Sequence, residues 1–555
     1  MAQSNGNGNG GRVIPLSRAR AAIARPRGAR HVDALISAPN PEAAVAALSI
    51  PELYFLVKDV GFADTTELIA LATPEQIRGC LDLDLWDRDR LEDSAAHPWL
   101  VSLMEAGYEK LGSVWEALDS ELAALILQRW TRIYDLSLEQ EAPENSDFPL
   151  VTTPDSFFAI EIIAPDEDDA RLTMRLIEDL YRADMVLARH TIMSARSEPP
   201  AELEEGSYRW RSGRMADIGY VEFYEALEVF RPLDPASIEI GEDAALDDVG
   251  GVAEGDESRV PRNLPATMAD AIAGDSFLAR ALAQVADGGE VDRLEASLVL
   301  LINKVLSASR VSPGDAEAVR TGAEHAAATV SLGLETVAAG SLDAAVRALA
   351  SVSVTRLHRA GFSVTLRLAR LAQVLAPRAV TSGDEDRALI AALCGARPWF
   401  PLELDDPPDT GVRAFGSVAD VRAVGQRLAV LALRIAIAEQ GMGADLLQIA
   451  TQPEPRPALD DHARTALARA LAGGDATGEP LGPDEIPGDF SPPARERAAA
   501  ALVARLDATG VTAGREYLTG LIGSWLERIH EQLGNLSEPP DPRFVSAVLL
   551  RSKLD

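Results

Sequence analysis

The stretch with the most distinctive chemistry is a run of arginine and aromatic residues between positions 208 and 220. It stands in a chain that is only 5% aromatic and carries a formal net charge of −34. Arginine, tryptophan and tyrosine are enriched at binding hot spots because they combine a large contact area with directional hydrogen bonds. The segment therefore predicts a surface that binds a partner. Its candidate residues are Tyr208, Arg209, Trp210, Arg211, Arg214, Asp217 and Tyr220.

The same residues are open to two other interpretations. The arginines could form an internal clamp, or the segment could hold an anionic ligand. Arg214 and Asp217 have the spacing of an ion pair on a helix. An enzymatic role is disfavoured, because arginine is a poor general base and no histidine or cysteine lies nearby. The acids available for a clamp are Glu202, Glu204, Glu205 and Glu222.

Familiar catalytic and metal-binding patterns are missing from the sequence. There is no glycine loop of the dinucleotide- or phosphate-binding kind and no Gly-x-Ser-x-Gly elbow. The seven histidines are scattered, and no two lie three or four residues apart. Asp460, Asp461 and His462 are adjacent, so on a helix they would point in different directions, and we assign them to a solvated helix start. We therefore predict no catalytic residue, no defined metal site and no cofactor.

The composition limits the class of protein. The chain has 555 residues, and 52 basic minus 86 acidic side chains gives the net charge of −34. Such an acidic surface repels polyanions, which argues against a nucleic-acid partner. Apolar residues make up 47% of the chain, which is enough for a full core.

The sequence also bears on the compartment. No window approaches the ~18–20 consecutive apolar residues that cross a bilayer. Residues 1–11 contain no apolar stretch that could be a signal-peptide core. The two cysteines, Cys80 and Cys394, are too few for a disulfide framework. These features predict a cytoplasmic protein without a membrane span.

The elements that position the candidate site begin with a series of helix starts. Four residues have the pattern of a helix N-cap, because a proline or an acidic or amide side chain follows within three positions. They are Asn40, Ser49, Asp64 and Thr73. The starts repeat, since 64 − 40 and 73 − 49 both equal 24. A period of this length with two short helices per unit is typical of stacked helical hairpins.

The remaining pattern is helical apart from one short interruption. Residues 150–153 and 157–163 predict two strands around a turn. We therefore expect a mainly α fold, with stacked short helical hairpins (α-solenoid-like) at the N-terminus, a small β-hairpin, and a second all-α helical domain. The longer predicted helices cover 121–138, 168–189, 275–285, 291–308, 316–338, 342–359, 363–375, 385–394, 418–439, 494–509, 513–533 and 542–550.

Composition shifts along the chain predict the domain limits. Residues 234–265 are acidic, contain glycine and lack large apolar groups, so we predict a disordered linker there. The predicted parts are a flexible basic N-terminal arm (1–29), a helical-repeat domain (30–146), an α+β segment with the hairpin and the Arg/aromatic motif (147–233), the linker (234–265), and an all-α helical domain (266–555) with a Pro/Gly-rich loop at 473–493.

Several separated strings, taken in order, resemble a known bacterial family. They are residues 51–58, 81–89, 207–219, 303–306, 331–335 and 359–366. Together they resemble the domain of unknown function 6178 family over most of the chain, from about Arg30 to the C-terminal helices. That family has no assigned reaction, so the resemblance implies no catalytic residue.

A second likeness concerns only residues 41–84. Their short Pro-Glu-started helices look like the cytosolic helical N domain of magnesium channels, which senses magnesium with acidic residues. The likeness implies weak binding of Mg²⁺ or Ca²⁺. The sequence thus favours a non-catalytic scaffold that binds another protein, with a cytosolic divalent-cation sensor or carrier as the alternative and an unrecognised carboxylate-based enzyme as a second alternative.

Overall fold

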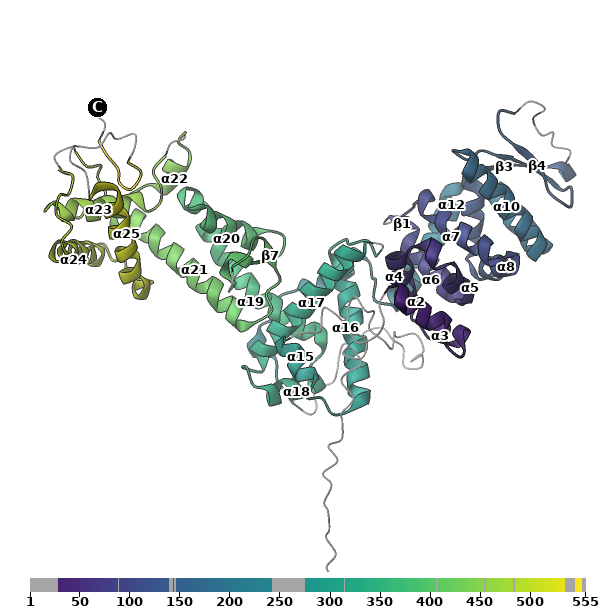
Figure 1. The fold of residues 1–555 in the computed structure, drawn as a ribbon, viewed down its shortest axis with the longest axis horizontal. Coiled ribbons are helices and arrows are strands. Elements are labelled where there is room, and N and C mark those ends of the chain that lie inside the picture. The colour runs from purple at the N-terminus through teal and green to yellow at the C-terminus, as the bar shows by residue number, and fades with distance from the viewer. Residues whose placement is uncertain are drawn as a thin grey trace, which may run out of the picture. The chain divides into compact units, whose positions relative to one another are not determined.

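The structure, a computed structural model, is mainly α-helical with a few small antiparallel strand pairs, as the sequence predicted (Figure 1). It describes residues 28–551 except 88, 139–142, 144–145, 242–274, 314, 406–407, 454–455, 483–484 and 535–544. The predicted N-terminal arm, up to residue 27, and the predicted acidic linker, from residue 242, lie outside the described residues. The chain divides into two compact units, Met1–Gly361 and Phe362–Asp555.

The first helices begin where the sequence places their caps, with one exception. Asn40 accepts a hydrogen bond from the Ala43 amide, and Ser49 and Thr73 each form a complete capping box. Asp64 was the fourth predicted cap, and this prediction is wrong by one residue: Asp64 ends a 3₁₀ turn, and α5 begins after Thr65. The elements are α2 (Ala29–Ile36), α3 (Pro41–Ala46), α4 (Ile50–Val60), η1 (Phe62–Asp64), α5 (Thr66–Leu71) and α6 (Pro74–Asp84).

Alternate helices in the N-terminal part of the chain pack on each other. The two 11-residue helices, α4 and α6, begin 24 residues apart, because 74 − 50 = 24, and they are in contact. Likewise α3 contacts α5, α5 contacts α7, and α6 contacts α8. A tight two-stranded turn separates α6 from α7. The further elements are β1 (Trp86–Asp87), β2 (Arg90–Leu91), α7 (Asp93–Ala106), α8 (Tyr108–Ala117) and α9 (Ser120–Arg129).

The predicted β-hairpin is present, and a third strand joins it. The sheet order is β3-β5-β4, with β5 in the centre and all pairs antiparallel. The sequence prediction of one helix over 121–138 is wrong in its second half, because α9 ends at Arg129 and residues 131–135 form a strand. These residues are rich in β-branched and aromatic types, and Ile133 pairs with Ile160 of β5. The strands are β3 (Thr131–Asp135), β4 (Leu150–Thr152) and β5 (Phe158–Ile162).

The rest of the first unit is helical. The prediction of helices over 342–359 and 363–375 misplaces their break, which falls at residues 352–353. Gly361 lies inside α19. A Cβ there would lie 2.1 Å from the carbonyl oxygen of Thr329 in α17, so only glycine lets the two helices approach this closely. The elements are α10 (Glu167–Ala183), α11 (Met185–Ser197), α12 (Pro200–Asp217), α13 (Phe223–Ala226), η3 (Leu227–Phe230), η4 (Pro235–Ser237), α15 (Phe277–Leu282), α16 (Gly288–Ala308), α17 (Ala316–Val337), α18 (Leu342–Ser351) and the first part of α19 (Val354–Leu375). Helix α19 continues beyond Gly361 into the second unit.

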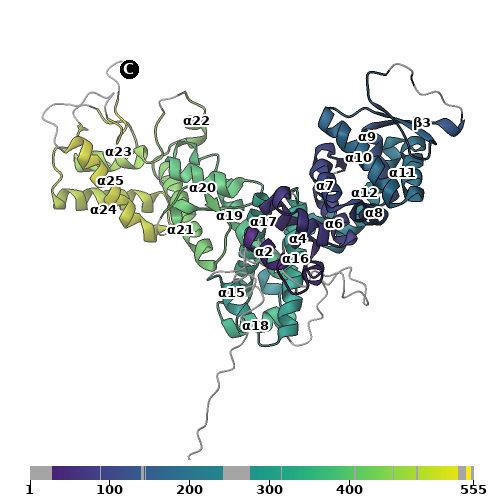
Figure 2. The same ribbon diagram turned by 45° about the vertical axis from the view of Figure 1, so that its right-hand side comes forward.

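The second unit is also helical, and α23, α24 and α25 gather around one core that contains Leu467, Leu502 and Trp525 (Figures 1 and 2). The predicted helix over 542–550 is wrong for its described part, because residues 545–551 are irregular, with a bend at 547–548, and Leu550 bridges to Leu481. Backbone hydrogen bonds between Leu481 and residues 549 and 551 replace those of a helix. The elements are α20 (Asp384–Cys394), β6 (Phe400–Pro401), β7 (Val412–Arg413), α21 (Val418–Ala436), a π-helical turn (Ile437–Gly441), α22 (Leu446–Ala450), α23 (Asp461–Leu471), α24 (Pro492–Ala508) and α25 (Leu518–Leu533).

Candidate functional site

The Arg/aromatic segment lies almost entirely on one helix, α12. Pro200 occupies its first turn, where its missing N–H costs nothing. Gly219, with φ of 89°, ends the helix, and its Cα lies so close to Leu300 that a Cβ would be 3.1 Å from that residue. One side of α12 packs on α9 and α6. Six of the seven predicted site residues lie on α12, and Tyr220 follows three residues after its end.

Arg214 lies at the centre of a buried charge cluster. Its Nε and Nη2 donate to the two carboxylate oxygens of Asp82 at 2.6 and 2.9 Å. Its Nη1 and Nη2 donate to Asp119 at 2.9 and 2.6 Å. Burial alone lowers the pKa of Arg214, but the hydrogen bonds to Asp82 and Asp119 raise it above the ordinary value. Arg214 thus stays charged and joins α12 to the end of α6 and the start of α9.

Arg211 points to the same side of the helix. Its Nε donates to the backbone carbonyl of Asp82 at 2.7 Å, and its guanidinium carbon lies 5.5 Å from the centre of the Trp86 ring. Trp86 is buried. The ring of Tyr208 lies 5.8 Å from that of Trp86, and its hydroxyl donates to Glu222 at 3.0 Å.

Three of the candidate residues face solvent instead. Trp210 is 57% exposed, and Asp217 is also exposed. The side chain of Arg209 is 79% exposed and lies 3.5 Å from Glu205 on the next turn. The segment therefore has an inner half, Arg211 and Arg214, and an outer half built around Trp210.

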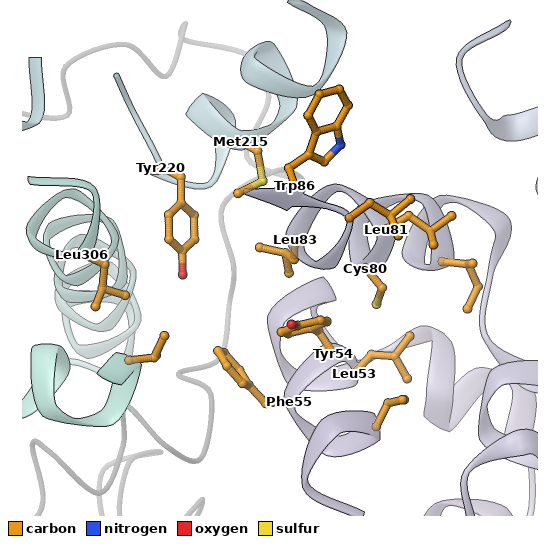
Figure 3. Close-up of a cluster of buried hydrophobic side chains, with 14 of the residues drawn as sticks. Leu53, Tyr54, Phe55, Cys80, Leu81, Leu83, Trp86, Met215, Tyr220 and Leu306 are labelled. Carbon is orange, nitrogen blue, oxygen red and sulfur yellow. The ribbon is translucent and has the colours of Figure 1, made fainter. Parts of the chain in front are cut away.

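Tyr220 belongs to the hydrophobic core. Figure 3 shows its ring between Leu306 and the helices that carry Tyr54 and Leu83. Burial raises the pKa of Tyr220 above its ordinary value, so the phenol stays protonated. Met215, in the last turn of α12, lies beside Trp86 in the same cluster (Figure 3). The core thus fixes the C-terminal end of the segment.

Sequence reasoning missed the main partners of the inner half. Asp82 and Asp119 lie 132 and 95 residues from Arg214 along the chain, so no local spacing pointed to them. Among the nearby acids, Glu222 and Glu205 contact Tyr208 and Arg209, while Glu204 accepts a hydrogen bond from the Leu91 amide.

A second buried polar cluster lies close by on α4, α6 and α7. The carboxylate of Asp84 accepts hydrogen bonds from the Tyr54 hydroxyl, the Lys58 ammonium and the Trp99 indole at 2.8, 3.0 and 2.8 Å. Burial raises the pKa of the neighbouring Cys80 thiol well above its ordinary value, which makes it a poor nucleophile. This cluster ties three helices together.

A surface hollow of about 450 Å³ lies beside the turn between β4 and β5. Asp155 lies in its wall and accepts hydrogen bonds from Tyr181, Thr153 and Arg189. Burial alone raises the pKa of Asp155, but these hydrogen bonds lower it to about 2. Its carboxylate is therefore ionised but already occupied by donors. The hollow is lined by Pro154, Asp155, Glu178, Tyr181, Arg182 and Met185.

The acid and histidine triplet at the start of α23 is divided among separate contacts. Asp460 binds Arg434, Asp461 binds Arg464, and burial lowers the pKa of His462. Across residues 28–551, as far as they are described, no three His, Cys, Asp or Glu side chains are grouped to hold a metal ion. The helices described there include none long and apolar enough to cross a bilayer.

Fold and site together define a mainly α-helical protein in which one side of the Arg/aromatic helix α12 is held by buried ion pairs and the other side is exposed to solvent. The model of a family of unknown function, DUF6178, matches residues 10–551, and the chain belongs to this family. No curated protein and no solved structure matches it. The likeness of residues 41–84 to the N domain of magnesium channels is therefore unsupported.

Proposed function

We propose that this protein is a non-catalytic helical scaffold that binds another protein through the outer face of α12. The observation that carries the proposal is the exposure of Trp210, which leaves 57% of a large aromatic side chain in solvent on a rigid helix. Tryptophan and arginine dominate the energetics of protein interfaces. Arg209, beside it, supplies exposed hydrogen-bond donors.

The inner half of the segment supports the same proposal. Arg214 holds α12 with four charge-assisted hydrogen bonds to two carboxylates on other helices. A helix fixed in this way presents Trp210 without further ordering on binding, which lowers the entropic cost of association. We therefore assign the inner half to positioning and the outer half to recognition.

The scaffold body in this proposal is the series of paired helices from α3 to α8. Such repeated units offer extended surfaces for docking. The protein would act in the cytoplasm, where thiols stay reduced, because Cys80 and Cys394 are both free.

Affinity capture from a native lysate tests the proposal. We expect Trp210→Ala to lose at least one protein that the wild type retains. Val186→Ala is the matched control, because Val186 is 73% exposed on α11 of the same unit. Identical sets of captured proteins for the wild type and Trp210→Ala would reject α12 as the binding surface.

A further inference from the structure

Charge is distributed unevenly along this acidic chain. Residues 344–383 contain no aspartate or glutamate, although the whole chain has a net charge of −34. Helix α19 lies in the middle of this stretch and has no acidic residue from end to end. The stretch is therefore a basic island in an acidic protein. Its arginines are Arg347, Arg356, Arg359, Arg367, Arg370 and Arg378.

The part of α19 in the second unit has two contrasting faces. Leu368, Ala372 and Leu375 are buried on one side. Leu371 and Val374 lie on the other side and are 41% and 64% exposed. Their spacing of three residues places them on one face of the helix.

Arginines lie on the same outer face as the two exposed apolar residues. Arg367 precedes Leu371 by four residues, and Arg370 precedes Val374 by four residues, so all four share one surface. Both arginines are exposed. We call this surface, Arg367, Arg370, Leu371 and Val374, the α19 outer face. It combines an apolar centre with positive charge and has no acid from its own helix.

We propose that the α19 outer face is a docking surface for an acidic, leucine-containing segment of a protein partner. Charge complementarity identifies the occupant: guanidinium groups bind carboxylates in a forked geometry. The exposed Leu371 and Val374 would receive apolar side chains spaced along an amphipathic helix. This surface lies in the second unit, so the inference goes beyond the function proposed for α12.

A short acidic segment fits this surface better than an anionic membrane. The Debye length is about 8 Å at physiological ionic strength, so a short segment senses mainly the local arginines. A charged membrane plane would instead meet a wide area of a protein with a net charge of −34. Binding to anionic vesicles is therefore the competing outcome to be tested.

Fluorescence anisotropy with the full-length protein tests the proposal. The probe is a fluorescein-labelled 16-residue peptide with leucine at helical spacing and glutamate elsewhere, and a second peptide carries lysine in place of glutamate. We expect the glutamate peptide to bind, more weakly at 300 mM than at 50 mM salt, and the lysine peptide not to bind this face. Arg370→Glu with Val374→Ser should raise the Kd for the glutamate peptide at least tenfold.

The control variant makes the same two chemical changes elsewhere. Arg528→Glu with Val186→Ser alters an exposed arginine of α25 and an exposed valine of α11, and it should change the Kd less than twofold. Equal weakening by both double variants, or no binding of the glutamate peptide, would overturn the proposal. So would phosphatidylserine vesicles that bind the wild type but not the α19 variant while peptide binding is unchanged.

Discussion

At the scale of single residues, Arg214 matters most because it satisfies two buried carboxylates at once. The Asp82 side chain is 2% exposed and that of Asp119 is 12% exposed. Bulk water therefore cannot replace Arg214 as the hydrogen-bond partner of either carboxylate. Removing one partner of a buried ion pair leaves an uncompensated charge, which is far more costly than the pair is stabilising. Arg209, five residues earlier on α12, makes a long contact in solvent instead.

We therefore predict that removing Arg214 destabilises the protein strongly and that removing Arg209 has little effect on its stability. Arg214→Ala should lower the free energy of unfolding of the first unit by about 3–5 kcal/mol. Arg209→Ala should change it by less than about 0.5 kcal/mol, as expected for an exposed pair. Urea unfolding monitored by circular dichroism measures both values. Similar losses for the two variants would contradict the division of α12 into inner and outer halves.

The carboxylate of Asp155 gives a prediction about pH. Its pKa is about 2 in the folded protein, below the ordinary value of about 3.9 expected in the unfolded chain. A carboxyl with a lowered folded pKa adds stability above the unfolded pKa and loses it as pH falls through the folded value. The stability difference between wild type and Asp155→Asn should thus be constant above about pH 5 and shrink between about pH 4 and 2. A difference that grows on acidification would contradict this assignment.

The site illustrates which residues can be predicted from sequence. The segment's composition identified α12, and its exposed Trp210 fits the sequence prediction of a binding surface, which remains untested. The direction of Arg211 and Arg214 could not be predicted, because their partner Asp82 comes from α6, more than a hundred residues earlier. Local spacing carries no information on such long-range ion pairs.

At the scale of elements, local signals predicted helix starts well and helix breaks poorly. The caps at Asn40, Ser49 and Thr73 depend on hydrogen bonds within four residues, so the sequence contains them in full. The strand at 131–135 exists because β5 pairs with it, and residues 545–551 are not helical because residue 481 bonds to residues 549 and 551. Both depend on distant partners, which override local helical pattern.

Gly361 lies in the gap that the sequence prediction left between helices 342–359 and 363–375, but α19 runs through it. It faces Gly333 of α17, where a Cβ would lie 1.9 Å from the carbonyl oxygen of Leu357. The two glycines let the backbones of α17 and α19 approach closely, so glycine here serves packing and not chain reversal. The sequence shows the residue type but not the neighbouring helix.

We predict that Gly361→Ala destabilises the first unit by about 1–3 kcal/mol, because the methyl group meets backbone atoms that cannot move aside. Gly523→Ala in α25 is the control, since a Cβ there has open space. The control should raise stability by about 0.5–1 kcal/mol through helix propensity. Thermal and urea unfolding of both variants test the contrast, and stabilisation by Gly361→Ala would rule out the close crossing.

At the scale of the whole molecule, the helical pattern of the sequence predicted the mainly α fold, and the resemblance of separated strings predicted the family, while the function remains a proposal. The net charge of −34 favours protein docking at particular surfaces over polyanion binding. It also keeps the cation-sensor alternative in view. The part of the chain described by the structure, however, offers no group of three metal-ligating side chains.

The scaffold proposal predicts that magnesium or calcium added at millimolar concentration shifts the Tm by less than about 1 °C. A ligand that binds the native state selectively must raise stability in proportion to its saturation. Differential scanning calorimetry with and without each metal measures the shift. A saturable rise in Tm would favour the cation sensor over the scaffold.

Site-specific photo-cross-linking tests the central claim most directly. A benzophenone amino acid replaces Trp210 in one sample and the exposed Val186 in a control, and both proteins are irradiated in cells that make the protein naturally. The binding role of the outer face of α12 predicts adducts to a partner protein from position 210 that are absent from position 186. The same adducts from both positions, or none from position 210, would contradict it.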